Sequence, residues 1–472
     1  MAARFCWNFA WAMIVSAGVG LPAAAAPLAR PNFIVFIADD MGFDDCGANG
    51  GPQVGTPHID RLAREGLRFT RAFLTCSSCS PSRASIITGR YPHNTGAEQL
   101  HWPLPAEQVT FMQVLRSSGY WTAAAGKWHL GQAVKPQLDE VAEGRADRWL
   151  PTFRKRPTDK PFCLWLASTD PHRPYKPGAS QPPHDPGKVV VPPYLPDVAE
   201  TRAELALYYD AISRLDRNMG EVLDELAGSG QAENTFILFI TDNGQPFPRA
   251  KTTVYDSGIK TPFIIRWPER VRGGGTCASL VSSIDIAPTI TELAGIPRSA
   301  SFQGVSLVPL LTDPEASVRS FIVAEHNWHD YTAYDRAVRT ERFAYIRNGY
   351  LDLPATPPAD AVGGTAFQAM RRLRDEGKLT ADQMKPFRVP RPAEELYDLQ
   401  SDPDELHNVA GDSAYSGELA RLRKLLDQWQ QETRDRMPRE RTPDGFDRNT
   451  GARLGKGGPR VASPELRAEQ VD

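Results

Sequence analysis

The chain is predicted to adopt an α/β fold: a large mixed, mostly parallel sheet flanked by helices, with a smaller C-terminal α+β subdomain that contains an antiparallel sheet. Short apolar runs alternate with helical patterns through the first two thirds of the sequence, as they do in βα units. After about residue 330 the alternation gives way to short strand-like runs joined by turns. A chain of 472 residues is long enough for one large domain and a smaller one.

Five apolar runs are expected to form buried strands of the large sheet. They are FIVFIADD (33–40), WTAAAGKWHLG (121–131), PFCLWLASTDPH (161–172), TFILFITDNG (235–244) and TPFIIRWP (261–268). Four of the five end in Asp, Lys or His within a few residues. Functional sites of open α/β sheets lie outside the carboxyl ends of the strands, so these polar residues indicate where a site would form.

Periodicity and proline content predict the other elements. Apolar residues recur every three or four positions from Leu205 to Leu226, which predicts an amphipathic helix that ends at Gly228 and Gly230. The proline-rich stretch 174–197 can be neither a helix nor a central strand, and it is expected to be an ordered surface loop near the site. The later part predicts two strands with a tight turn in DRAVRTERFAYIRNGY, then a strand, a turn and the start of a helix in AEELYDLQSDPDELHNVAG, and a helix from Ser416 to about Thr433.

The expected organisation has four parts. Residues 1–26 resemble a secretory signal peptide, because Arg4 precedes an apolar run to about Leu21 and small residues end near Ala26. The alternative is an uncleaved membrane anchor. Residues 27–330 would form the large domain, residues 331–437 the C-terminal subdomain, and residues 438–472, rich in Gly, Arg and Pro, a disordered tail.

These features predict an exported protein, periplasmic or secreted, whose mature form has no integral membrane span. The formal net charge of -3 argues against nucleic acid as a partner, because binding to the phosphate backbone needs a strongly basic surface. An anionic substrate would therefore have to be met by a local cluster of basic residues.

Cys76 and Cys79 form a Cys-x-x-Cys pair, which is compatible with a redox dithiol, half of a zinc site or two buried small residues. No second pair at metal-binding spacing is present, and the spacing of the cysteines is not typical of a disulfide scaffold. The residues from Cys79 onward, CSPSRASIITGR, resemble the signature of the type I sulfatases, with Ile87 where the family usually has Leu. The resemblance implies an alkaline-phosphatase-like fold and conversion of Cys79 to formylglycine by a formylglycine-generating or maturase enzyme. Cys76 is expected to be a packed free thiol.

The resemblance also implies a divalent metal, Ca²⁺ or Mg²⁺. Its ligands would be Asp39 and Asp40 after the first strand, Asp242 and Asn243 in FITDNG, and the modified Cys79. Carboxylate and amide oxygens are the ligands that these hard cations prefer. Taken without the signature, acidic pairs at strand ends are often helix caps or solvated turns.

The local basic cluster comes from three further motifs and the signature itself. GYWTAAAGKWHLG resembles the second sulfatase signature and carries Lys127 and His129 to the site, while STDPHRPY supplies His172. Lys251 follows the Asp242 and Asn243 pair, and Arg83 belongs to the first signature. Taken singly, a Lys is more often a solvated side chain and a His more often a hydrogen-bonded loop residue. Together they are expected to hold a sulfate group and offset the charge that develops on the leaving atom.

The implied mechanism uses the hydrated aldehyde of residue 79 as a nucleophile toward sulfur, which gives a covalent sulfated enzyme. His172 or Lys251 would protonate the leaving oxygen or nitrogen, and His129 would remove the proton that allows sulfate to be expelled. Within the family the chain resembles the heparan N-sulfatases (N-sulfoglucosamine sulfohydrolases), through motifs such as TDNGQPFPRAKT and WQQETRD. That likeness places His101 and His326 near the sugar.

The expected substrate is therefore a sulfated oligosaccharide, with the N-sulfate of glucosamine in heparan sulfate or heparin as the favoured bond. The stretch from Gly131 to Lys160 is shorter than in the heparan N-sulfatases, and such loops shape sugar pockets. An O-sulfatase acting on another sulfated polysaccharide is the main alternative. A phosphatase or phosphonate hydrolase of the same superfamily, and a noncatalytic sulfoglycan-binding protein, are further ones.

Overall fold

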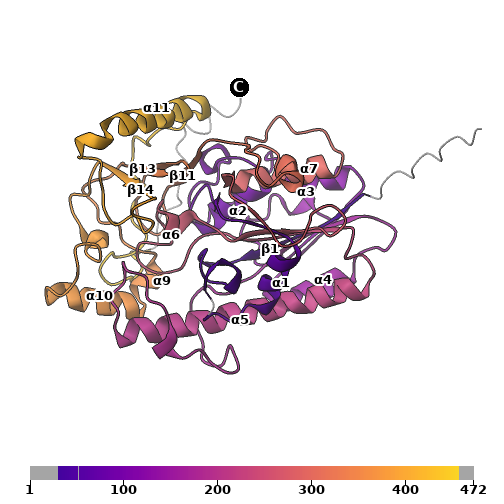
Figure 1. Cartoon of the computed structure of the whole chain (residues 1–472), viewed down its shortest axis with the longest axis horizontal. Coiled ribbons are helices and arrows are strands. Elements are labelled where there is room, and N and C mark those ends of the chain that lie inside the picture. The colour runs from indigo at the N-terminus through magenta and orange to yellow at the C-terminus, as the bar shows by residue number, and fades with distance from the viewer. Residues whose placement is uncertain (1–29, 52, 456–472) are drawn as a thin grey trace, which may run out of the picture.

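The computed structural model describes residues 30–51 and 53–455. An eight-stranded sheet runs through the larger part of the molecule, and a four-stranded sheet lies beside it under the long helix α11 (Figure 1). The predicted signal peptide, residues 1–26, lies outside the described residues. Within the described part, no helix combines the length and the apolar character needed to span a bilayer.

The large sheet is mixed and mostly parallel, as predicted. In spatial order its strands are β5 (Glu140–Glu143), β4 (Trp121–Gly126), β6 (Phe162–Ala167), β1 (Asn32–Ala38), β7 (Thr235–Thr241), β8 (Phe263–Arg266), β2 (Leu67–Phe69) and β9 (Gly275–Cys277). Only β8 runs antiparallel to its neighbours in this sheet. All five runs that were predicted to be strands are strands, and they occupy adjacent central positions.

The sheet is buried on both faces because its strands alternate their side chains between two cores. Along β1, Phe33, Val35 and Ile37 belong to one core. Ile34 and Phe36 belong to the other. The first core is covered by α2 (Cys79–Thr88), α3 (Phe111–Ser117) and α7 (Ile286–Leu293), and the second by α1 (Pro57–Glu65), α4 (Trp149–Arg154) and α5 (Ala199–Gly228) (Figure 1).

The predicted amphipathic helix is α5. The apolar positions that predicted it, from Leu205 to Leu226, are buried against the sheet. The proline-rich stretch 174–197 is a loop that contains no strand and no helical element other than the 3₁₀ helix at Pro186–Lys188, as expected from its proline content.

The second sheet is antiparallel and has the order β11 (Ile322–His326), β12 (Asp335–Arg339), β13 (Phe343–Asn348) and β14 (Glu394–Asp398). Helix α11 (Ser416–Thr433) packs on it through Leu422, Leu426 and Trp429 (Figure 1). Two short helices, α9 (Ala359–Val362) and α10 (Thr365–Asp375), lie in the long β13–β14 connection, and α10 packs on α5. The strand β11 precedes the boundary expected at residue 331, so this sheet begins earlier than predicted.

Two expectations about the C-terminal part are wrong. After β14 the chain forms turns, and no helix starts before the short 3₁₀ turn at Ser413–Tyr415. Residues 438–455 are not a disordered tail, because they pack on the body of the protein through bonds such as that from Trp328 Nε1 to Pro443 O, at 2.8 Å. Composition alone could not indicate these contacts. Residues 456–472 lie outside the described part.

Candidate active site

The acidic residues of the candidate site come together at the carboxyl ends of two neighbouring parallel strands. β1 pairs with β7 in a register that places Ala38 opposite Thr241, so Asp39 and Asp40 emerge beside Asp242 and Asn243. The Asp40 N–H donates a hydrogen bond to Asp242 Oδ1 at 3.2 Å. Asp40 has a φ of 73°, a left-handed conformation that Asp tolerates better than most residues and that turns the chain sharply at the strand end.

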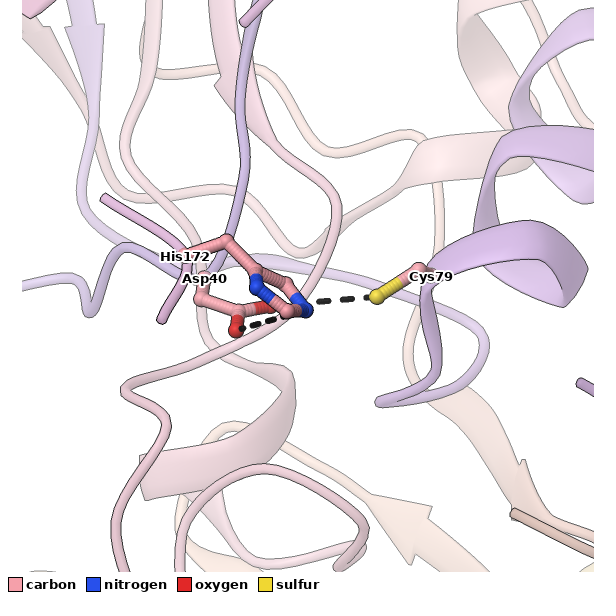
Figure 2. Close-up of side chains that lie close together, drawn as sticks. All are labelled: Asp40, Cys79 and His172. Carbon is pink, nitrogen blue, oxygen red and sulfur yellow. Dashed lines mark hydrogen bonds and ion pairs between the residues drawn. The ribbon is translucent and has the colours of Figure 1, made fainter. Parts of the chain in front are cut away.

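Cys79 is the first residue of α2 and is 2% exposed. Its Sγ lies 3.8 Å from Asp40 Oδ1, and Figure 2 shows Asp40 and His172 pointing toward the Cys79 side chain. Burial raises the pKa of the Cys79 thiol well above its ordinary value, although Lys127 and Lys251 oppose this. The unmodified side chain is therefore a neutral thiol in the folded protein. Cys76 is also a buried free thiol, as expected.

Three cations face the three carboxylates: Arg83 and Lys251 are buried, and Lys127 is partly exposed. Lys127 Nζ contacts Asp39 Oδ2 at 2.6 Å, and Lys251 Nζ contacts Asp40 Oδ1 at 2.7 Å. Arg83, which is fully buried, donates from Nε to Asp242 Oδ2 at 2.8 Å and from Nη1 to the Lys127 carbonyl at 3.0 Å. Buried charges are stable only when paired in this way, and each cation is held close to the Cys79 side chain by its pair.

Burial and the nearby charges shift the pKa values of Asp39 and Asp242 in opposite directions. Burial alone would raise the pKa of Asp39, but Lys127 and the other nearby cations hold it well below its ordinary value. Burial raises the pKa of Asp242 to about 6, against the opposing effect of Arg83 and with help from the Asp39 charge. Three carboxylates packed into one buried site repel one another, and a bound cation would relieve this repulsion.

The donor set fits a hard divalent cation. The nearest ligand atoms of Asp39, Cys79 and Asp242 lie within 4.8 Å of one another, as do those of Asp40, Cys79 and His172. Asn243 Nδ2 donates to Asp40 Oδ1 at 2.5 Å, while Asn243 Oδ1 is buried and has no hydrogen-bond donor among the described residues. A buried carbonyl oxygen without a donor is available as a metal ligand.

Three histidines line this group. His172 is 31% exposed, and its Nε2 lies 3.9 Å from Asp40 Oδ2 and 3.8 Å from Asp360 Oδ2. Its Nδ1 donates to the Arg173 carbonyl at 2.5 Å, which leaves Nε2 to face the site. His129 Nε2 and His101 Nδ1 share a hydrogen bond of 2.7 Å. Burial and the nearby Lys127 lower the pKa of His129, so its ring is neutral at physiological pH.

A cavity opens beside Lys251 and extends into the C-terminal subdomain. It begins at Thr252, and its lining includes His326, His329, Tyr350 and residues 353–356. Its wall combines aromatic rings with polar groups, the composition expected where a sugar ring stacks on an aromatic face and its hydroxyls form hydrogen bonds. His326 is buried, and burial lowers its pKa to about 4.

Comparison with known proteins identifies the family. The family model described as Sulfatase matches residues 31–137 and 132–296, and the model described as the C-terminal domain of N-sulphoglucosamine sulphohydrolase matches residues 249–352. An ulvan-active sulfatase of Formosa agariphila is 32% identical to this chain, over 85% of this chain and 74% of the relative. Human N-sulphoglucosamine sulphohydrolase is also 32% identical, over 88% of this chain and 93% of its own. This chain belongs to the sulfatase family.

The fold of this sulfatase is the alkaline-phosphatase-like fold that the sequence predicts. The solved structure of BT4656, in complex with its substrate D-glucosamine-2-N,6-O-disulfate, superposes with a TM-score of 0.71 and 21% identity, over 87% of this chain and 99% of that chain. The protein is an enzyme, a sulfatase hydrolase, as its family and relatives establish.

The structure of this sulfatase brings the predicted metal ligands and cations together around Cys79, and it places the two predicted sugar-binding histidines farther out. Asp39, Asp40, Asp242 and Asn243 surround Cys79 together with the predicted cations. His101 reaches the site through its hydrogen bond with His129, and His326 lies in the adjoining cavity rather than beside Cys79.

Two residues that line the site were not predicted. His329 Nδ1 and Ser78 Oγ share a hydrogen bond of 2.7 Å directly before Cys79, and His329 borders the cavity. Asp360 reaches the site from α9, and its side chain is 32% exposed next to His172. His329 lies in the same EHNWHDY motif as His326, and this proximity in the sequence could have indicated that His329 also lines the site. Nothing local to Asp360 in the sequence indicated that its segment folds back over His172.

Proposed function

We propose that this sulfatase hydrolyses the N-sulfate of glucosamine in heparan sulfate- or heparin-type oligosaccharides, with Cys79 converted to formylglycine and with bound Ca²⁺ or Mg²⁺. The observation that carries the proposal is the burial of Cys79 between the carboxylates of Asp39, Asp40 and Asp242 and the cations Arg83, Lys127 and Lys251. Similarity to human N-sulphoglucosamine sulphohydrolase over nearly all of both chains supports the choice of the N-sulfate.

Asp39, Asp40, Asp242 and Asn243 would hold the metal. When bound, the metal supplies positive charge to the sulfate oxygens and to the oxygen nucleophile that the modified residue 79 provides. Lys127, Lys251 and Arg83 surround the same position and would hold the other sulfate oxygens through charge-assisted hydrogen bonds. Because their own carboxylate partners fix them, these cations are already oriented before the substrate binds.

Two histidines would move protons in the two steps of the reaction. His172 is partly exposed, and its Nε2 faces the site, so it or Lys251 would donate a proton to the departing nitrogen or oxygen. His129 is neutral because burial lowers the pKa of its ring, and a neutral imidazole can accept the proton whose loss lets sulfate leave residue 79.

The sugar would lie in the cavity bounded by His326, His329 and Tyr350. This placement is consistent with the role expected for His326 near the sugar, whereas His101 contacts His129 and does not line this cavity. The sulfated position would then lie next to Lys251, and the rest of the ring would lie against polar and aromatic side chains, as sugar sites require.

An O-sulfatase acting on another sulfated polysaccharide is the second candidate. One observation favours it: the ulvan-active sulfatase is as similar to this chain as the human enzyme is, at 32% identity. The reaction at sulfur would be the same, and the difference would lie in the leaving atom and in the ring that the cavity accepts.

The test measures sulfate release from N-sulfoglucosamine, glucosamine 6-sulfate and 4-nitrophenyl sulfate, and phosphate release from 4-nitrophenyl phosphate. We expect the highest kcat/KM with N-sulfoglucosamine and far slower release of phosphate than of sulfate from the aryl pair. Cys79→Ala is the control and should abolish turnover while the protein stays folded. Preference for the 6-O-sulfate would favour the O-sulfatase, and preference for the phosphate ester would contradict both candidates.

The proposal includes maturation and export. A formylglycine-generating or maturase enzyme would have to act on Cys79 before folding finishes, since the side chain is 2% exposed in the folded protein. The charge and apolar pattern of residues 1–26 supports export to the periplasm or the medium, where sulfated polysaccharides would be met.

A further inference from the structure

The C-terminal strap, defined here as residues 440–455, runs along the segment that carries His329 and Tyr331 of the cavity. Hydrogen bonds join the strap to residues 328–332 at several points: Trp328 Nε1 to Pro443 O (2.8 Å), Gly445 N to Asp330 O (2.7 Å), Thr332 N to Asp444 Oδ1 (2.7 Å) and Thr332 Oγ1 to Thr442 O. A further link from Gln99 Nε2 to Thr442 Oγ1, at 2.9 Å, ties the strap to the loop before His101. The strap therefore holds one wall of the cavity.

Arg448 connects the strap to a second segment of the cavity lining, residues 354–356. It lines the cavity, its side chain is 14% exposed, and its guanidinium lies 4.9 Å from the centre of the Tyr331 ring. All of its N–H groups have acceptors: Nε donates to Asp444 Oδ2 (2.6 Å), Nη1 to Pro354 O (2.9 Å) and Thr356 Oγ1 (3.2 Å), and Nη2 to Thr332 O (3.1 Å) and Asp444 Oδ1 (3.0 Å).

Because a guanidinium has five N–H donors and all five are used, Arg448 has none left for a substrate. Any effect of Arg448 on substrate binding must therefore act through the protein groups to which it is hydrogen-bonded. These groups belong to residues 331–332 and 354–356, two segments of the cavity lining that are separated in sequence and that no strand pairing within the described part of the chain joins directly. The planar fork of Arg fixes both distance and angle between them, which a flexible Lys side chain would not do.

We infer that the C-terminal strap completes the substrate cavity, and that Arg448 is a positioning residue that holds two segments of the cavity lining, residues 331–332 and 354–356, in place for the ring carrying the sulfate. The inference rests on the proposed function only in taking that ring to be a sugar. Cleavage of the sulfate group itself uses residues around Cys79, none of which Arg448 contacts. Changes in the strap should thus weaken the binding of a sugar sulfate, and they should not change the cleavage of a smaller substrate that does not occupy the cavity.

The test compares Arg448→Gln and Arg448→Lys with the wild type. The substrates are 4-nitrophenyl sulfate and whichever of N-sulfoglucosamine and glucosamine 6-sulfate the wild type cleaves faster. A displaced wall misplaces the sugar, so we expect both variants to raise KM for the sugar sulfate by about tenfold and to leave kcat/KM for the aryl sulfate within about twofold. Arg453→Gln is the matched control, because Arg453 lies in the same strap with an exposed side chain.

Parallel losses on both substrates, or an unchanged KM for the sugar, would overturn the inference. If Arg448→Gln does not fold, Asp444→Asn weakens the same contacts while preserving shape, and it should shift the sugar KM in the same direction. The preference of the wild type between the two sugar sulfates tests the proposed function separately. Faster cleavage of the 6-O-sulfate would contradict the N-sulfatase proposal, and the comparison of sugar and aryl substrates in the variants would still test the role of Arg448.

Discussion

Asp40 is the residue on which most contacts of the site converge. Its carboxylate accepts from Lys251 Nζ and Asn243 Nδ2, and it lies 3.8 Å from Cys79 Sγ. Asp40, Cys79 and Lys127 could be predicted because each lies in a short continuous segment that resembles the sequence of the sulfatase family. Asp360 could not be predicted, because it reaches His172 only through the folding of a connection far along the chain.

The proposed ligand set is tested by Asp242→Ala. The change removes one carboxylate and leaves Arg83 without its closest partner, so metal affinity should fall by at least about tenfold. Metal content per chain, measured by mass spectrometry after equilibration in limiting Ca²⁺ or Mg²⁺, checks this. Asp224→Ala is the control, since Asp224 is an exposed acid whose ion pair is with Arg61. Undiminished metal in Asp242→Ala would exclude this residue as a ligand.

Individual elements were predicted well where they are long or strongly periodic. The five buried strands and α5 follow from hydrophobic pattern, whereas β2, β3 (Ala72–Phe73), β9 and β10 (Val281–Ser282) were missed because two or three residues carry no usable period. The antiparallel direction of β8 was also unpredictable, since it depends on where β2 and β7 lie rather than on the local sequence.

Helix α5 supports the site through one hydroxyl. Tyr208 Oη is fully buried and lies 2.6 Å from Asp45 Oδ2, 3.1 Å from the Gly42 N–H and 3.1 Å from the Asp40 carbonyl. The hydroxyl donates to one oxygen and accepts from Gly42, and so fixes the turn that presents Asp39 and Asp40.

Tyr208→Phe should therefore lower the free energy of unfolding by about 1–3 kcal/mol, because it leaves buried polar groups without a partner. Metal affinity should fall as well, since the turn is less well held. Urea unfolding and metal titration measure the two effects. Tyr209→Phe, on the same helix, is the comparison and should have the smaller effect on metal. Equal metal affinity in Tyr208→Phe and wild type would remove the link between α5 and the site.

At the scale of the whole molecule, a buried charged network joins the large domain to the C-terminal subdomain. His93 Nδ1 contacts Glu325 Oε2 of β11 at 2.7 Å, and His93 Nε2 contacts the Thr433 carbonyl at 3.1 Å. Arg336 of β12 pairs with Asp435 at 2.7 Å. Both ring nitrogens of His93 face acceptors, so the network favours the protonated ring. Burial opposes this, but Glu325 raises the pKa of His93 above its ordinary value.

The raised pKa of His93 predicts a pH dependence of stability. A histidine whose pKa is raised by folding contributes stabilisation that is complete below its unfolded pKa of about 6.5 and is lost as pH rises through the folded value. His93→Gln should consequently destabilise the protein more at about pH 6 than at about pH 9. Thermal unfolding of both proteins at the two pH values measures this. A loss that is the same at both would show that His93 is neutral in the fold.

In the proposed mechanism, residue 79 of the active enzyme is an oxidised side chain that lies beside a bound metal and the paired cations Arg83, Lys127 and Lys251. The most direct measurement is the mass of the tryptic peptide that ends at Arg83, taken from fully active protein made in its native host. We expect an aldehyde or its hydrate at residue 79 and an intact thiol at Cys76. A peptide with thiols at both positions, from enzyme that releases sulfate at its full rate, would contradict it.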